Sequence, residues 1–157
     1  MSAVLGDVGT SVELGAFIGY AAEPWRCRLR LRRDVTSGHG GLLAEAEVSR
    51  VVYRRPGASV AARLATTWAS AGYMRSFFGV DERQAAASGL PVFAAGAGMK
   101  EVSLTAAGEF TVAPRVAVVL NAGLQRLLGD AGQSPLVRLR GSAMQVRAGV
   151  YVTYRFD

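Results

Sequence analysis

The sequence predicts an all-β fold, an antiparallel up-and-down transmembrane β-barrel of which this chain of 157 residues would supply about seven or eight strands. The clearest observation is the segment from Met144 to Phe156, where apolar and polar residues alternate at almost every position. A period of two places side chains on opposite faces of a strand, and thirteen residues extend about 40 Å, which suits a tilted strand across a bilayer. Similar alternation recurs along the chain, and the connections between alternating segments are by turns short and long. Outer-membrane barrels have this arrangement of short and long connections.

The predicted strands cover residues 10–20, 25–33, 42–54, 58–74, 99–112, 115–128 and 142–156. The short connections contain proline and cover 21–24, 55–57 and 113–114; the long ones are rich in glycine and polar residues and cover 34–41, 75–98 and 129–141. Because the last strand of such a barrel ends in the periplasm, counting back places every short turn there and every long loop outside. The apolar faces should then contact lipid and the polar faces the interior, whereas a soluble fold would bury the apolar faces in a core.

Composition limits the alternatives. Hydrophobic residues make up 50% of the chain, yet no apolar run approaches the roughly 20 residues of a membrane helix, so a helical membrane protein is excluded. The net charge of +6 could indicate nucleic acid, but the arginines are spread along strands, so we expect no nucleic-acid partner. Cys27 is the single cysteine, and no Cys/His spacing indicates a metal site. We therefore expect no metal, no cofactor and no disulfide.

The whole chain, 1–157, is predicted to form a single but partial barrel domain. An even number of strands requires one more strand before segment 10–20, and residues 1–5 can supply only its end. The first fifteen residues have neither the basic region nor the apolar region of a signal peptide. We therefore expect a mature fragment or an N-terminally truncated form of a larger barrel.

A column of arginines gives the sharpest local prediction. Arg26, Arg28, Arg30 and Arg32 share one face of segment 25–33, and the next segment offers Glu45 and Glu47 on its polar face. A hairpin symmetric about 37–38 would place Arg30 opposite Glu45 and Arg28 opposite Glu47, each pair contributing about 0.2–1 kcal/mol. These residues are predicted to form a charge cluster in the lumen. It would serve either structural pairing or a constriction selective for anions.

The long connections contain further signals. Asp81 and Gln84 resemble a capping box, which predicts a short helix over 82–88 that ends before Gly89 and Pro91 and lies across the outer mouth. This helix would act as a plug or recognition element, or simply order the loop. Four residues of the last long connection are typical of turns, and the Asp130 carboxylate could accept hydrogen bonds from loop amides. These outer-loop motif residues are Gly129, Asp130, Ser134 and Pro135.

Two further sets of side chains have alternative interpretations. Several aromatic residues fall near predicted strand ends, where they would anchor the chain at the membrane interface or, in a soluble fold, pack in a core. They are Trp25, Trp68, Tyr73, Phe77, Phe78 and Tyr154. His39 is the only histidine and lies in a glycine-rich connection near Asp34 and Ser37. Such a group could in principle be a hydrolase, but the loop spacing supports neither an oriented base nor an oxyanion site, so we predict no catalytic residue.

Several stretches resemble the MipA/OmpV family of outer-membrane proteins, the MltA-interacting protein and its relatives. The stretches are Tyr73-Met74, Phe77-Phe78-Gly79-Val80, Gln84-Ala85, Ser88-Gly89-Leu90-Pro91, Gly98-Met99-Lys100-Glu101-Val102, Leu127-Leu128-Gly129-Asp130-Ala131, Ser134-Pro135-Leu136-Val137 and, at the end, Gly149 with Tyr154-Arg155-Phe156. The resemblance spans the whole chain but only the C-terminal part of a longer family member. Gln133 replaces an expected acidic residue, and Asp157 follows the terminal phenylalanine.

The resemblance implies an outer-membrane β-barrel in contact with outer-membrane lipid. Tyr154 and Phe156 would form the C-terminal signal read by the barrel-assembly machinery. Some relatives are described as non-enzymatic scaffolds that join a lytic transglycosylase to a peptidoglycan synthase, and others are linked to osmotic adaptation or adhesion at the surface. Two alternatives stay open: a small-solute pore whose selectivity the arginine column sets, and a lipid-modifying outer-membrane enzyme centred on His39.

Overall fold

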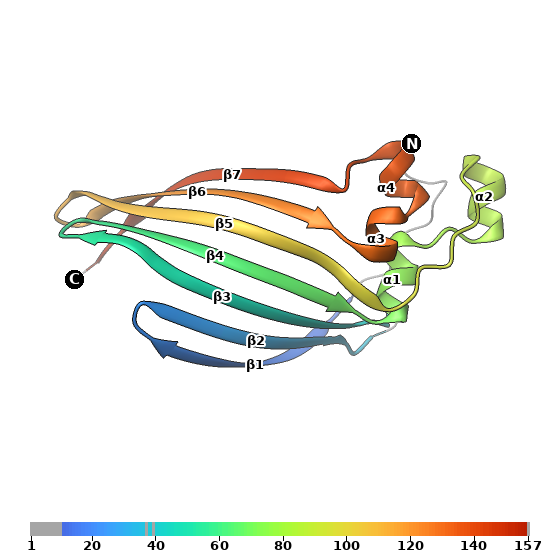
Figure 1. Cartoon of the computed structure of the whole chain (residues 1–157), viewed down its shortest axis with the longest axis horizontal. Helices are drawn as coiled ribbons and strands as arrows, with labels where there is room; N and C mark the ends of the chain where they lie inside the picture. Colours follow the sequence, from blue (N-terminus) through green and yellow to red (C-terminus); the bar gives the residue numbers. More distant parts are fainter. Residues whose placement is uncertain (1–10, 37, 39, 157) are drawn as a thin grey trace.

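The computed structural model describes residues 11–36, 38 and 40–156, and it contains one sheet of seven strands in sequential order (Figure 1). The strands are β1 (Glu13–Ala22), β2 (Trp25–Asp34), β3 (Leu42–Arg55), β4 (Ala58–Ala69), β5 (Gly98–Ala113), β6 (Val116–Leu127) and β7 (Met144–Tyr154). All six neighbouring pairs are antiparallel, so the predicted up-and-down topology is confirmed. Within the described residues β1 and β7 do not pair, and the sheet is a curved, barrel-like one that is not closed.

The two ends of the sheet differ as the connection lengths predict. The three short turns lie at one end, and the four helices lie at the other, the long-loop end (Figure 1). The helices are α1 (Ala71–Phe78), α2 (Glu82–Ser88), α3 (Gly129–Gln133) and α4 (Pro135–Arg140). None of the described helices has the length and apolar character needed to cross a membrane.

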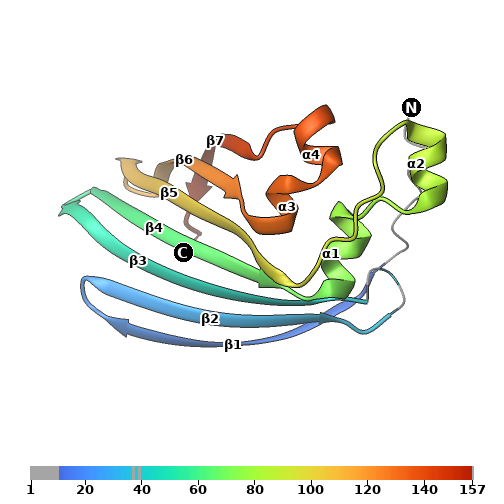
Figure 2. The same ribbon diagram turned by 45° about the vertical axis from the view of Figure 1, so that its right-hand side comes forward.

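The sheet has one covered face and one uncovered face. The inner face is the one on which α1 and α3 pack, and the outer face is its opposite (Figure 2). Large apolar side chains on the outer face are open to the surroundings: Ile18 is 71% exposed, Leu120 44% and Val150 70%. No second layer of the described chain covers them. The soluble alternative required these residues in a core, whereas here they lie exposed on the outer face.

The hydrophobic core sits at the long-loop end rather than along the sheet. Inner-face residues of three strands meet apolar residues of the helical cap, which we define as α1, α3 and the segment between α2 and β5. The buried cluster consists of Leu43, Ala69, Met74, Ala95, Leu127 and Ala131. Ala69 and Ala131 are fully buried and Met74 is 1% exposed, so the packing there resembles the interior of a soluble protein.

The structure corrects the fourth predicted strand, 58–74. The strand β4 ends at Ala69, and the chain turns into α1 because Met74 and Phe78, four residues apart on one helix face, pack into the cap core. The interface role predicted for Tyr73 and Phe78 is therefore wrong, since both side chains pack against that core.

The predicted helix over 82–88 is present as α2, with both hydrogen bonds of the capping box between Asp81 and Gln84 and a left-handed Gly89 at its end. Its predicted position is wrong: α2 projects away from the sheet, whereas α1 and α3 cover the inner face (Figures 1 and 2). None of its residues is buried. The capping box fixes local structure, but α2 has no apolar face to hold it against the sheet.

The last strand is shorter than the predicted segment 142–156. Ladder pairing in β7 ends with Tyr154 opposite Val116, and one further backbone hydrogen bond joins Arg155 N to Arg115 O at 3.0 Å. The rings of Tyr154 and Phe156 meet edge to face with centroids 4.8 Å apart. Phe156 is 84% exposed, so the terminal aromatic pair is an accessible feature at the short-turn end.

Candidate functional site

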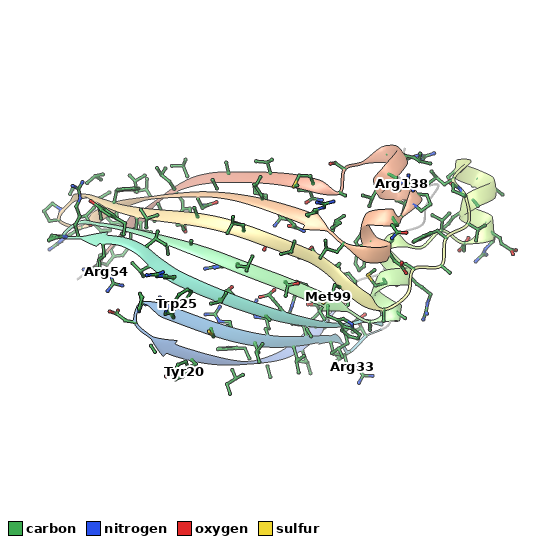
Figure 3. The ribbon with its side chains drawn as sticks, viewed as in Figure 1. Tyr20, Trp25, Arg33, Arg54, Met99 and Arg138 are labelled. Carbon is green, nitrogen blue, oxygen red and sulfur yellow. The ribbon has the colours of Figure 1, made fainter. Side chains whose placement is uncertain are left out.

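The candidate site is the polar inner face between the cap and the short turns. Figure 3 shows side chains projecting from both faces of the sheet. The register of β2 against β3 places Arg30 opposite Glu45 and Arg28 opposite Glu47, as the sequence predicts. The prediction assumed only that the hairpin is symmetric. A register shift of one residue would instead have moved every arginine to the other face.

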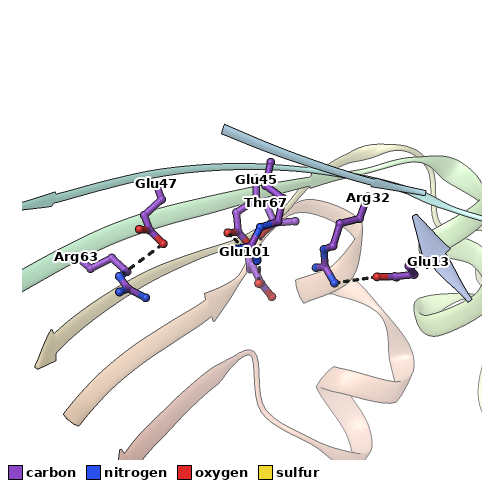
Figure 4. A network of polar contacts seen from close by, with 8 residues as sticks. Glu13, Arg32, Glu45, Glu47, Arg63, Thr67 and Glu101 are labelled. Carbon is purple, nitrogen blue, oxygen red and sulfur yellow. Dashed lines mark hydrogen bonds and ion pairs between the residues drawn. The ribbon is translucent and has the colours of Figure 1, made fainter. Parts of the chain in front are cut away.

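The charges pair across strands only partly as expected (Figure 4). Arg30 Nη1 lies 3.9 Å from Glu45 Oε1, at the outer limit of an ion pair. Glu47 instead pairs with a residue of β4, its Oε2 lying 3.5 Å from Arg63 Nε. The predicted contact of Arg28 with Glu47 is thus replaced, and the Arg28 guanidinium lies over the Phe17 ring, 5.6 Å from its centroid. Arginine favours such a ring contact because its planar cation is weakly hydrated.

At the end of the arginine column nearer the cap, Arg32 pairs with a residue of β1. Arg32 Nη1 donates to Glu13 Oε2 at 2.9 Å. The approach is possible because Gly15 faces Arg32 across the strands: a Cβ there would lie 2.8 Å from Leu31 O and 3.0 Å from Arg32 Cγ. A side chain at Gly15 would therefore displace Arg32 from Glu13. Arg26, at the other end of the column, is exposed.

One acid of the inner face was not part of the predicted charge cluster: Glu101, which lies near the capped end of the sheet opposite Thr67 and Leu127. Its carboxylate accepts hydrogen bonds from Gln125 Nε2 and from Thr67 Oγ1, and Lys100 Nζ lies 3.1 Å from it. The adjacent Lys100 reaches the same side because the β4–β5 register shifts between Thr67 and Trp68. Alternation within β5 places Glu101 on the polar face, but this shift, which brings Lys100 to it, has no clear sequence signal.

The polar residues of six strands line one hollow of about 380 Å³ on the inner face. It extends from Arg28 and Arg30 in β2 to Arg147 in β7, which shows how far the sheet curves around it. Arginines outnumber acids among its lining side chains, which are Arg28, Arg30, Arg63 and Arg147 against Glu45, Glu47 and Glu101. The hollow is thus polar and mildly cationic.

The outer-loop motif residues fasten the cap rather than form turns. Residues Gly129–Gln133 and Pro135–Arg140 are the helices α3 and α4, so the turn prediction for this stretch is wrong. Asp130 Oδ2 accepts from Gly96 N at 2.7 Å, the amide-binding role that the sequence predicts. Ser134 is fully buried, and its hydroxyl donates to Phe78 O at 2.7 Å. Gly129 has a left-handed φ of +48°, and Pro135 occupies the first turn of α4.

Other candidate chemistry has no described geometry behind it. His39 and Ser37 lie outside the described residues. Asp34 is described and nearly buried, and its carboxylate accepts from Thr36 N and from Gly40 N, which folds the β2–β3 connection. In the part of the chain that the structure describes, no three His, Cys, Asp or Glu side chains come together as a metal-binding group.

These features define a class: an up-and-down, barrel-like β-protein with an apolar outer face, a polar inner face and a helical cap at its long-loop end. The family model described as MltA-interacting protein MipA matches residues 2–156, and the chain belongs to that family. Comparison with curated proteins found no match. Membership supports, in general terms, an outer-membrane MltA-interacting protein.

Proposed function

We propose that this protein is a non-enzymatic scaffold of the outer membrane that binds a lytic transglycosylase and a peptidoglycan synthase. Membership of the MltA-interacting family supports the first partner. The observation that carries the proposal is the helical cap, because it is a packed obstruction over the inner face rather than an open mouth. Met74, Ala69 and Ala131 are essentially inaccessible there, so packed side chains cover the long-loop end of the inner face.

Insertion in the outer membrane is the second part of the proposal. The two tryptophans lie on the outer face at opposite ends of the sheet. Trp68 is opposite Ala44 of β3, and Ala44 is opposite Leu31 of β2. Trp25 is the first residue of β2. Leu31 lies six positions along the strand from Trp25, a distance of roughly 20 Å. Tryptophans at the two borders of an apolar band are typical of membrane interfaces.

Lipid quenching tests the insertion. The protein, reconstituted in vesicles, is prepared with Trp25→Phe or Trp68→Phe so that one tryptophan remains. Lipids brominated near the headgroup should quench both single-tryptophan proteins more than lipids brominated deep in the chains. If neither tryptophan is quenched by any brominated lipid, the outer face does not contact acyl chains and the membrane assignment is wrong.

Capture tests the scaffold. The purified protein, immobilised in detergent, should retain an MltA-type lytic transglycosylase and a peptidoglycan synthase from a periplasmic and membrane extract. An immobilised barrel without a partner role is the control. Absence of the transglycosylase from the eluate would contradict the scaffold.

A small-solute pore is the second candidate, favoured by the cationic hollow on the inner face. Planar-bilayer recording separates it from the scaffold, for which we expect no single-channel steps. The lipid-modifying enzyme stays a further alternative: any lipase activity should disappear with His39→Ala, and full retention would remove that histidine from consideration.

A further inference from the structure

One strand extends beyond its neighbour at the short-turn end. The last pair between β2 and β3 is Trp25 with Arg50, whereas pairing of β3 with β4 continues to Arg55 opposite Ala58. A hydrogen bond from Val51 N to Pro24 O at 3.1 Å closes the β2 side. Beyond it, residues 52–55 have β4 on one side and, within the described chain, no strand on the other. Figure 1 shows the β3–β4 hairpin projecting past the β1–β2 turn.

This step leaves a notch beside an exposed strand edge. The register of β3 shifts between Val51 and Tyr53, and a hollow of about 210 Å³ is lined by Glu23, Pro24 and residues 51–54. Val52 is 57% exposed and Tyr53 47%. A strand edge of four residues presents about 13 Å of backbone donors and acceptors that can pair with an added chain.

The surroundings of the notch are basic. Arg54 lines it, Arg50 and Arg55 flank its strand residues in the sequence, and Glu23 is the one acid among its lining residues. Arg54 Nη1 lies 3.0 Å from Glu23 Oε1. Both side chains are more than half exposed, so this ion pair contributes little free energy, and Arg54 can pair with another carboxylate instead. Arg50 and Arg55 lie over the rings of Trp25 and Tyr53, contacts that orient the guanidinium groups without neutralising them.

We propose that the notch binds an extended acidic segment of a partner protein, which adds as a strand along residues 52–55 while carboxylates on its two faces pair with Arg54 on one side of the sheet and Arg55 on the other. The assignment of this partner to the periplasm rests on the proposed function. A peptide fits better than a lipid headgroup, because the strand edge offers alternating N–H and C=O groups. A peptide satisfies both, whereas a phosphate accepts hydrogen bonds but donates none to the carbonyls.

The direct test uses the full chain in neutral detergent and a fluorescent hexapeptide, Val-Glu-Glu-Glu-Glu-Val, whose consecutive glutamates place carboxylates on both faces of the added strand. Fluorescence anisotropy should show saturable binding. The double variant Arg54→Glu, Arg55→Glu should weaken it by about tenfold or more, because two attractive contacts become repulsive. Arg138→Glu is the matched control: this exposed arginine lies in α4, at the opposite end of the sheet, and should leave the affinity unchanged.

A second peptide separates strand addition from simple charge attraction. The same hexapeptide, methylated on alternate backbone amides, keeps its carboxylates but loses donors for the strand edge, so its binding should be lost. Equal binding of both peptides, equal binding to the charge-reversed variant, or binding only to vesicles rich in anionic phospholipid would overturn the proposal. Unchanged heat-modified mobility on electrophoresis shows that the variants are folded.

Peptide binding and transglycosylase capture together distinguish failure of the notch proposal from failure of the scaffold proposal. If the charge-reversed protein still captures the transglycosylase, the scaffold stands and the notch is not its docking site. If the unaltered protein binds the hexapeptide but captures no transglycosylase, the notch stands and the scaffold fails.

Discussion

The two ends of the sheet are stabilised in different ways. At the long-loop end, the helices α1 and α3 bury Met74 and Ala131 against Leu43 and Leu127 of the strands. At the short-turn end, residues 52–57 are all exposed, and the tips are held by backbone pairing and by contacts between exposed side chains such as Arg54 with Glu23. Apolar packing is the main stabilising contribution in a folded domain, so the capped end should keep its shape without a partner.

The difference indicates where binding can occur. The cap has a packed apolar core, whereas a projecting strand edge keeps unpaired backbone groups that an added chain can pair with. The chain thus combines a closed end with an end that can add contacts. The variants below test whether the two ends respond as differently as their packing implies.

Truncation in the cap core should have the largest effect. Met74 is 1% exposed, so Met74→Ala removes buried atoms and leaves a cavity that α1 can only partly fill. We expect the free energy of unfolding to fall by about 2–5 kcal/mol, measured by urea titration in detergent. Leu139→Ala is the control, because Leu139 in α4 is 66% exposed and its loss should change stability by less than about 0.5 kcal/mol. Equal losses in the two variants would mean that the cap is not a packed core.

Removal of one buried hydroxyl should have an intermediate effect. Ser134 is fully buried and donates to Phe78 O, whereas Ser142 donates to Met144 O at 2.9 Å in an exposed position. Ser134→Ala leaves a carbonyl without its donor inside the cap and should lower the unfolding free energy by about 1–3 kcal/mol. Ser142→Ala lets water replace the hydroxyl, so the same titration should show little change. A larger loss for Ser142→Ala would contradict this assignment.

Much of the sheet could be predicted from local pattern alone. Period-two alternation located all seven strands, and the symmetry of the 25–54 hairpin gave the register that places Arg30 opposite Glu45. The capping box at Asp81 likewise predicted α2, because both of its hydrogen bonds form within four residues.

The cap could not be predicted in the same way. Met74 belongs to one buried cluster with residues of β3, β6 and α3 that are distant in sequence, and this long-range packing, not local propensity, ends β4 at Ala69. The pairing of Glu47 with Arg63 instead of Arg28 depends on how far the sheet curves, which alternation does not encode. Interactions within one hairpin could thus be predicted from the sequence, whereas those that join several elements could not.

The smallest expected effect concerns the ion pairs on the inner face and at the short-turn end. Glu47 is 12% exposed in its pair with Arg63, whereas Glu23 is 74% exposed in its pair with Arg54. A double-mutant cycle with Glu47→Gln and Arg63→Gln should give a coupling energy of about 0.5–1 kcal/mol, because water screens a half-buried pair less. The cycle with Glu23→Gln and Arg54→Gln should give roughly 0–0.3 kcal/mol.

Salt sharpens this last comparison. At 1 M salt, where the screening length is about 3 Å, the coupling at the tip should vanish while that on the inner face persists in part. Equal coupling energies that fall together with salt would show that the inner face is as open to water as the projecting hairpin. Such a result would mean that the curvature that brings β2 and β7 around one hollow does not shelter its charges from solvent.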